Sequence, residues 1–120
     1  MSVLFANTAR GYGGDREGGR MPYSIMTAAI ERKESLTGKF ENYIRHFSPH
    51  ALGEDGDGRH AVLGFQYDGG RPGGLPIGGD WCCFTLSGLS GVHPNTDKWI
   101  VGPMTGKPWH LLSGIQVQAE

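Results

Sequence analysis

The sequence has little cysteine, and its two cysteines are poorly placed for a disulfide or a metal site. Cys82 and Cys83 are adjacent. Neighbouring residues of a strand point to opposite faces, so we expect two reduced, partly buried thiols. The chain also lacks a Cys-x-x-Cys motif, which argues against a zinc ribbon or a thioredoxin-like redox site.

Histidines do not make up for the missing cysteines. His46 and His50 lie four residues apart, a spacing that would align two metal ligands on a helix. Pro49 between them disfavours a helix, and no cysteine or carboxylate lies at a supporting spacing. We therefore expect no metal site and no cofactor.

An excess of one charge and long apolar runs are missing too. The chain has 11 Lys and Arg against 12 Asp and Glu, a formal net charge of -1, so any nucleic-acid binding must come from a local patch. No apolar run approaches the roughly 20 residues that span a bilayer. The apolar start, residues 1–6, is too short for the core of a signal peptide. These absences predict a cytoplasmic protein with no membrane contact.

Glycine is what the sequence has in abundance. It supplies 21 of 120 residues, whereas the usual share is about 7%. With only 38% hydrophobic residues, this composition favours short strands and tight turns over a helical bundle. We expect a flexible Gly/Arg arm over residues 1–21 and a single domain over 22–120, because residues 7–20 have almost nothing to bury.

The first half of the domain is predicted to contain one helix and several strands. The apolar stripe that begins near Ile25 predicts a helix near residues 23–36. Strands are expected at about 35–41 and 43–48, because Pro49 is unfavourable in a central strand. The acidic turn at 54–58 predicts a hairpin that leads into a buried strand at 60–67.

The second half alternates loops and strands. Glycine and proline fill residues 68–80, which predicts a long surface loop. A strand is expected at 81–86, and Leu89 and Val92 are expected to continue it beyond a kink at Gly88. Residues 109–117 fit either a strand or a short helix. The fold class is therefore mainly β or α+β, with an N-terminal helix on a small five-stranded barrel.

Two segments could bind an anion. The stretch Gly69–Gly74 could surround a phosphate with backbone amides, with Arg71 as the charge, or it could be a plain strand connector. Arg45 lies between Ile44 and Phe47 in a strand-like segment. It could bind a carboxylate or phosphate through its guanidinium, or it could be a solvated surface arginine or part of a structural ion pair.

The order of elements resembles the WYL domain, a ligand- or nucleic-acid-sensing module of bacterial transcription regulators. The similarity covers about residues 25–93: a helix ending in Ala-Ile-Glu-Arg-Lys, then Arg45, then Ser-Pro-His-Ala-Leu-Gly, a Gly-Arg turn, and two apolar strands. It implies a small Sm-like barrel. The family's naming triplet would fall at 60–62, where this chain has His-Ala-Val, and of the family's basic positions Arg45 and Arg59 carry over.

We expect a non-catalytic regulatory module that binds a ligand or nucleic acid, as an accessory to a bacterial regulator or defence system. Its candidate partners are a nucleotide or a single-stranded nucleic acid, bound by cations and by stacking on aromatic rings. The residues proposed for this site are Tyr43, Arg45, Arg59, Tyr67 and Arg71.

Two other functions are open. The chain could be a protein-interaction or oligomerisation subunit that uses the barrel edge and the Trp-rich C-terminal segment, with Trp99 and Trp109 as anchors. An enzyme is not expected, because the sequence shows no recognised pairing of a nucleophile with a base.

Overall fold

The structure is a computed structural model that describes residues 20–105 and 108–119. It contains one helix, six strands and two short 3-10 helices. In chain order these are α1 (Arg20–Arg32), β1 (Leu36–Phe40), β2 (Tyr43–Glu54), β3 (His60–Gly69), β4 (Asp80–Thr85), η2 (Leu86–Gly88), β5 (Ser90–Pro94), η3 (Trp109–Leu111) and β6 (Ser113–Gln118).

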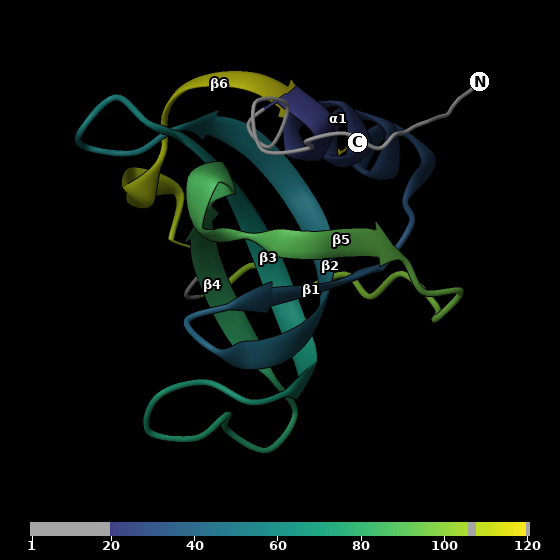
Figure 1. The fold of residues 1–120 in the computed structure, drawn as a ribbon. Helices are drawn as coiled ribbons and strands as arrows, with labels where there is room; N and C mark the ends of the chain where they lie inside the picture. Colours follow the sequence, from purple (N-terminus) through teal and green to yellow (C-terminus); the bar gives the residue numbers. More distant parts are fainter. Residues whose placement is uncertain (1–19, 106–107, 120) are drawn as a thin grey trace.

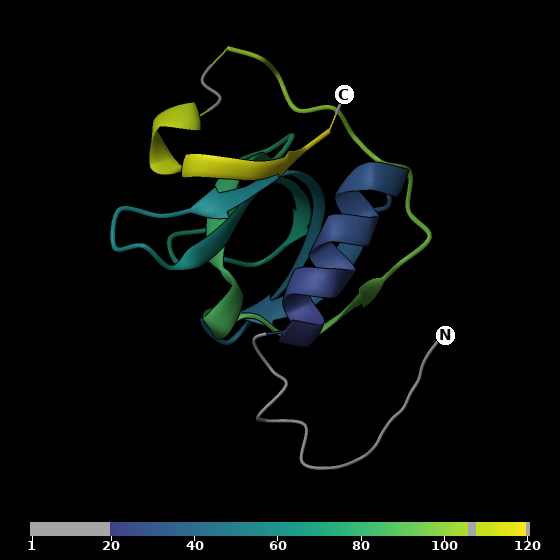
Figure 2. The same ribbon diagram turned by 90° about the horizontal axis from the view of Figure 1, so that it is seen from above.

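All strand pairings in the described residues are antiparallel and form one strongly curved sheet (Figures 1 and 2). The order is β4-β3-β2-β1-β5, and β6 pairs with β2 off this path. The prediction of a mainly β chain with an N-terminal helix is confirmed. The closed five-stranded barrel is wrong, because no pairing joins β4 to β5 in the described residues and the sheet stays open.

The open sheet follows from the way the chain leaves β4. The 3-10 turn η2 separates β4 from β5, and Gly88 in this turn packs so closely on the ring of Phe40 that an added Cβ would lie 2.6 Å from it. The segment after this turn therefore lies beside β1. It forms the separate strand β5, and not the continuation of β4 past Gly88 that the sequence predicts. β5 has only five residues, and its pairing with β1 shifts register between Thr37 and Lys39.

Helix α1 covers one side of the curved sheet (Figure 2). Its buried residues Met26, Ala29 and Ile30 follow the spacing of a single helix face. The helix ends at Arg32 and not at the predicted residue 36, because Lys33 takes a left-handed φ of 56°. The Glu34 N–H then donates to the Ala29 carbonyl at 2.9 Å, which closes the last turn.

Strand β2 is longer than predicted because it passes through Pro49 to Glu54. The register with β3 shifts between Pro49 and Ala51, so an extra residue is accommodated there as a bulge. A bulge is one of the few places where a strand interior tolerates proline, which has no N–H to donate. As a result β2 is long enough to pair with β1, β3 and β6.

The hairpin through the acidic turn is confirmed, since Glu54 pairs with His60 across it. The loop between β3 and β4 is confirmed as well. At the C-terminal end, the two alternatives for residues 109–117 occur one after the other, as the 3-10 helix η3 and the strand β6. Nearly all of the predicted arm, residues 1–21, lies outside the described residues, and α1 already begins at Arg20.

Both faces of the sheet bury apolar side chains. We call the first group the inner cluster; it lies between α1 and the curved sheet and contains Met26, Ala29, Ile30, Leu36, Phe47, Leu52, Val62, Phe84, Leu86 and Leu89. The outer cluster contains Ala51, Ala61, Leu63, Phe65, Trp81 and Leu112. The two free cysteines divide between the clusters: Cys82 packs on the inner one and Cys83 on the outer one, as expected for neighbours in a strand.

Candidate functional site

The five predicted site residues fall in three separate places. Tyr43, Arg45 and Arg71 gather at one end of the sheet, where β2 begins and β3 ends. Arg59 belongs to the hairpin turn at the other end of β2 and β3. Tyr67 lies on the outer face, beside the outer cluster. The sheet therefore does not bring all five residues into one binding site.

Arg45 is buried inside the curve of the sheet, with 2% of its surface exposed. Its Nε donates to the Phe40 carbonyl at 3.2 Å, and its Nη1 donates to Gln66 Oε1 at 3.2 Å. Its Nη2 donates to Glu41 Oε1 at 3.1 Å in an ion pair. The guanidinium carbon also lies 5.3 Å from the ring centre of Phe84. These contacts match the structural ion pair that the sequence left open for this arginine.

The partner of Arg45 comes from a tight turn. Glu41 and Asn42 join β1 to β2 with φ values of 54° and 68°, the left-handed pair of a two-residue hairpin turn. Neither residue is glycine, so each adopts this conformation at a steric cost. The turn places the Glu41 carboxylate on the solvent side of the Arg45 guanidinium, and 58% of the glutamate side chain stays exposed.

Arg71 is held by the end of the loop in which it lies. It donates to Asp80 Oδ2 at 3.0 Å and to the Gly74 carbonyl at 3.3 Å. It also donates to Cys82 Sγ at 3.6 Å, and this thiol in turn donates to Gln66 Oε1 at 3.5 Å. Burial raises the pKa of Cys82 even though the guanidinium opposes that effect. Asp80 thus neutralises the guanidinium charge of Arg71, which was predicted to bind a phosphate.

The loop that begins at Arg71 has a defined shape. The Gly74 N–H donates to the Arg71 carbonyl and the Gly79 N–H donates to the Pro76 carbonyl, each at 2.9 Å, so the loop consists of two consecutive turns. Gly79, at a φ of 94°, packs on the Gln66 carbonyl with no room for a Cβ. Between these fixed points Ile77 is fully exposed.

Arg59 is paired within its own hairpin. Its side chain reaches Asp55 Oδ2 at 3.2 Å and Asp57 Oδ2 at 3.1 Å. The Arg59 backbone N–H also donates to Asp55 Oδ1 at 3.0 Å, and this bond is the main reason that the pKa of Asp55 is lowered. The segment is a self-contained turn, as its sequence predicts.

Tyr67 belongs to a polar group that sequence reasoning missed. Its hydroxyl donates to Asp97 Oδ2 at 2.8 Å and accepts from Asn95 Nδ2 at 2.9 Å. The same Asn95 amide reaches Thr37 Oγ1 at 3.0 Å, and Thr37 Oγ1 lies 2.8 Å from His46 Nδ1. Burial, followed by the Asp97 bond, raises the pKa of Tyr67. The sequence could have indicated only the contact between Thr37 and His46, because these two residues face each other if the two predicted strands form a hairpin.

This polar group does not have the geometry of a catalytic triad. Thr37 and His46 are in contact as a hydroxyl and a base would be, but Thr37 has only 9% of its surface exposed. The carboxylate of Asp97 binds Tyr67. It therefore supports the tyrosine and not the histidine.

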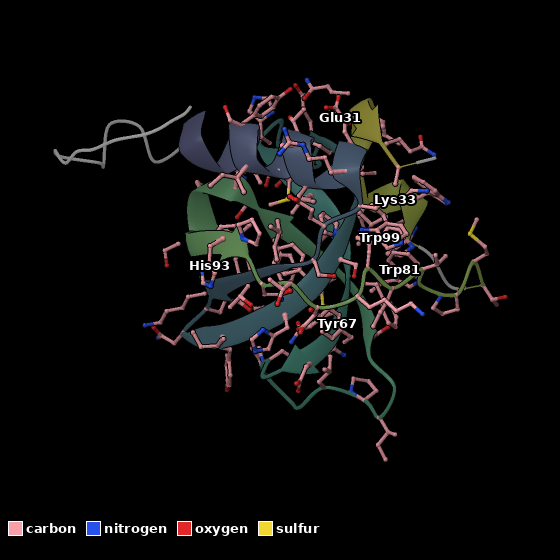
Figure 3. The ribbon with its side chains drawn as sticks, turned by 90° about the vertical axis from the view of Figure 1, so that its right-hand side faces the viewer. Glu31, Lys33, Tyr67, Trp81, His93 and Trp99 are labelled. Carbon is pink, nitrogen blue, oxygen red and sulfur yellow. The ribbon has the colours of Figure 1, made fainter. Side chains whose placement is uncertain are left out.

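Trp99, an expected interaction anchor, is used within the chain. We call residues 95–103 the strap, since they cross the outer face of the sheet. The Trp99 ring stacks on His50 with 4.3 Å between ring centres, and its Nε1 donates to the Pro49 carbonyl at 3.3 Å. Figure 3 shows Trp81 and Trp99 close together, with Tyr67 farther along the same face. Trp109 packs on the outer cluster.

The strap is fastened by buried polar groups of β2. The Ile100 N–H donates to Ser48 Oγ at 2.9 Å, and the Gly102 N–H donates to His50 Nε2 at 3.4 Å. Trp81 Nε1 donates to the Pro103 carbonyl at 2.9 Å. In contrast to these fixed contacts, the side chains of Val101 and Met104 are 68% exposed.

Comparisons of this chain with protein-family models, with curated proteins and with solved structures gave no match. The resemblance to the WYL domain therefore stays a prediction. Within the described ranges no group of three His, Cys, Asp or Glu side chains could hold a metal ion. Nor does that part of the chain contain a helix with the length and hydropathy of a membrane span.

Proposed function

We propose that this chain is a non-catalytic protein-interaction module. The observation that carries the proposal is the loop between β3 and β4, which holds Ile77 fully exposed within the second of its two hydrogen-bonded turns. An ordered loop that presents an apolar side chain loses little conformational entropy on binding. Such side chains serve as anchors at the centre of protein interfaces.

The charges in the described residues favour a protein over nucleic acid. The predicted cations Arg45, Arg59 and Arg71 each have a carboxylate within 3.2 Å. Because each pair is locally neutral, these arginines provide little of the positive potential that draws a polyanion to a protein. Exposed apolar side chains are available instead: Tyr43, Ile44, Ile77, Val101, Met104, Leu111 and Ile115.

Site-specific photocrosslinking tests the proposal. A photoreactive phenylalanine analogue replaces Ile77 in the cells that normally make the protein, and the same analogue replaces the exposed Lys98 as the control. We expect a discrete protein adduct from position 77 and none from position 98. Adducts with nucleic acid alone, or equal protein adducts from both positions, would overturn the proposal.

A second candidate function is the binding of a small anion or nucleotide at Arg45, as the WYL resemblance implies. The observation that favours it is the placement of Glu41, whose exposed carboxylate lies on Arg45 Nη2 from a turn with left-handed backbone. A ligand carboxylate or phosphate could replace this side chain on the guanidinium. Binding of such a ligand at Arg45 would then be the signal by which the chain regulates a bacterial regulator or defence system.

Calorimetric titration with a nucleotide and with single-stranded DNA and RNA tests this candidate. If it holds, Glu41→Ala raises the affinity because the competing carboxylate is gone, and Arg45→Lys lowers it because an ammonium lacks the fork of the guanidinium. Two salt concentrations separate the ligands, since single-stranded nucleic acid shows the steeper salt dependence. The absence of binding to the native chain and to the Glu41→Ala variant would exclude this candidate.

A further inference from the structure

The main strand order ends at β4 and β5, and only one of these two edges is protected against further pairing. β5 contains Pro94, has Gly91 at a φ of 62°, and shifts register against β1. β4 pairs with β3 in continuous register from Asp80 to Thr85, and it contains no proline, no glycine and no charged residue after Asp80. A regular edge strand of this kind is a template for pairing with another extended chain.

The backbone groups that β4 turns away from β3 belong to every second residue. The Trp81 N–H donates to Asp80 Oδ1 at 2.9 Å, so it points away from β3. Because antiparallel pairing alternates along a strand, the N–H and C=O groups of Cys83 and Thr85 point to the same side. No strand pairs with β4 on that side in the residues that the structure describes. Cys83 and Thr85 thus present donors and acceptors with the spacing that an added strand needs.

The end of this edge that holds Thr85 is acidic. Thr85 pairs with the beginning of β3, directly after the hairpin turn. Residues 54–59 of that turn carry three carboxylates against one arginine, an excess of two negative charges. Burial and, to a smaller extent, the Asp55 charge raise the pKa of the Cys83 thiol, so the charge of the turn is felt in the middle of β4. A partner that pairs with β4 is therefore favoured by a cation at this end.

We propose that the partner of this interaction module is another protein that adds an extended segment, as a strand, to the free edge of β4. The pairings of the sheet are antiparallel, so the added strand runs antiparallel to β4 and has a lysine or arginine at its N-terminal end, beside the acidic turn. Its other side chains alternate between the two faces, next to the partly exposed Cys82 and Cys83. This inference rests on the proposed interaction function, and β4 begins only three residues after Ile77.

Hydrogen exchange of the full chain with a synthetic peptide tests the strand addition. The probe is a short peptide with lysine at its N-terminal end, followed by alternating valine and threonine. In its control every backbone amide is methylated, which removes the donors and keeps the side chains. The Cys83 and Thr85 amides should exchange fast in the chain alone, and saturating probe should slow both by about tenfold or more. The Cys82 and Phe84 amides, which face β3, should change little.

Thr85→Pro removes one pairing donor from the chain itself. Thr85 has a φ of -69°, which is close to the value that proline requires, so the variant should fold, as circular dichroism can check. Thr85→Val keeps the N–H and is the matched control. The probe should bind Thr85→Pro about 3- to 10-fold more weakly than Thr85→Val, as expected for the loss of one hydrogen bond. If Thr85→Pro does not fold, the exchange pattern and the methylated peptide decide the question.

Several results would overturn the proposal. These are slow exchange at Cys83 and Thr85 in the chain alone, no protection by the probe at millimolar concentration, equal protection by the methylated peptide, and equal binding to Thr85→Pro and Thr85→Val. Protection that grows with the concentration of the chain alone would assign the edge to a second copy and overturn the proposal as well. Protein crosslinks from position 77 would then still support an interaction module, whereas their absence would remove that function whatever the peptide does.

Discussion

The Arg45 end of the inner face and the strap over the outer face are both held by buried side chains, but in different ways. At the Arg45 end, one guanidinium connects a backbone carbonyl, an amide and a carboxylate, and it also lies against aromatic rings. The strap is held by separate hydrogen bonds: Ser48 and His50 each accept from a different backbone N–H of the strap, and Trp81 donates to a backbone carbonyl.

This difference determines how each region should respond to mutation. A single substitution of Arg45 removes all of its contacts at once, since they share one side chain. In the strap, a single substitution removes one hydrogen bond and leaves the others in place, so we expect smaller losses in the free energy of unfolding.

Arg45→Ala should have the largest effect. It empties a buried volume against Phe40 and Phe84 and leaves the carbonyl oxygen of Gln66 with only the weak bond from the Cys82 thiol, which should reduce the free energy of unfolding by about 2 to 4 kcal/mol. Urea denaturation measures the loss. Arg45→Lys should recover part of it, and an unchanged midpoint for Arg45→Ala would show that this network contributes little to stability.

Gly102→Ala should have the next largest effect, because it is the strap position with the least room. A Cβ at Gly102 would overlap the Trp81 ring and lie 2.8 Å from Phe65. Displacing these rings should destabilise the protein by about 1 to 3 kcal/mol. Thermal unfolding followed by tryptophan fluorescence measures it, and Gly56→Ala is the control for the glycine change alone, because a Cβ there meets nothing within 4 Å and its φ is not left-handed.

Ser48→Ala should have a smaller effect on the same strap. The change leaves the Ile100 N–H and the Ser35 hydroxyl without this partner, at a cost of about 1 to 2 kcal/mol. Hydrogen exchange at the Ile100 amide should become faster, while exchange of the α1 amides should change much less. Equal acceleration in both places would mean that the strap and the inner cluster open together.

Asp55→Asn should have the smallest effect, and one that depends on pH. The pKa of Asp55 is lower in the folded chain, so its carboxylate stabilises the fold fully above the ordinary aspartate value of about 3.9, and this contribution is lost as the pH falls through the folded-state pKa. Asp55→Asn should therefore lower the melting temperature slightly at neutral pH and match the native chain in strong acid. Asp57→Asn, which keeps the Asp55 carboxylate and its bond from the Arg59 backbone, should leave this Asp55 contribution in place.

The sequence predicts local structure well where a residue acts on its immediate neighbours. The acidic hairpin, the glycine-rich loop and the separate faces of Cys82 and Cys83 depend on adjacent positions. It failed where a distant contact decides the outcome. Pro49 is accepted in β2 because a bulge against β3 accommodates it, and η2 leads the chain to β1 because Gly88 lies on Phe40.

The candidate site was harder to predict than the fold for the same reason. The charge of an arginine is visible in the sequence, but the carboxylate that neutralises it is known only once the chain is folded. Arg71 meets Asp80 across a loop, and Arg45 meets Glu41 only because the two-residue turn folds back. The sequence did not indicate that Ile77 is exposed, because the exposure of an apolar side chain depends on the folded shape of its loop.

The adjacent cysteines provide two chemical reporters in one short peptide. Both thiols are partly buried, and burial raises the pKa of each, so alkylating reagents should modify them slowly in the folded chain and faster when the surrounding structure opens. Cys82 would then report on the inner cluster and Cys83 on the outer one. Timed alkylation read by fragment mass spectrometry could follow both faces of the sheet in a single unlabelled sample, without introducing any substitution.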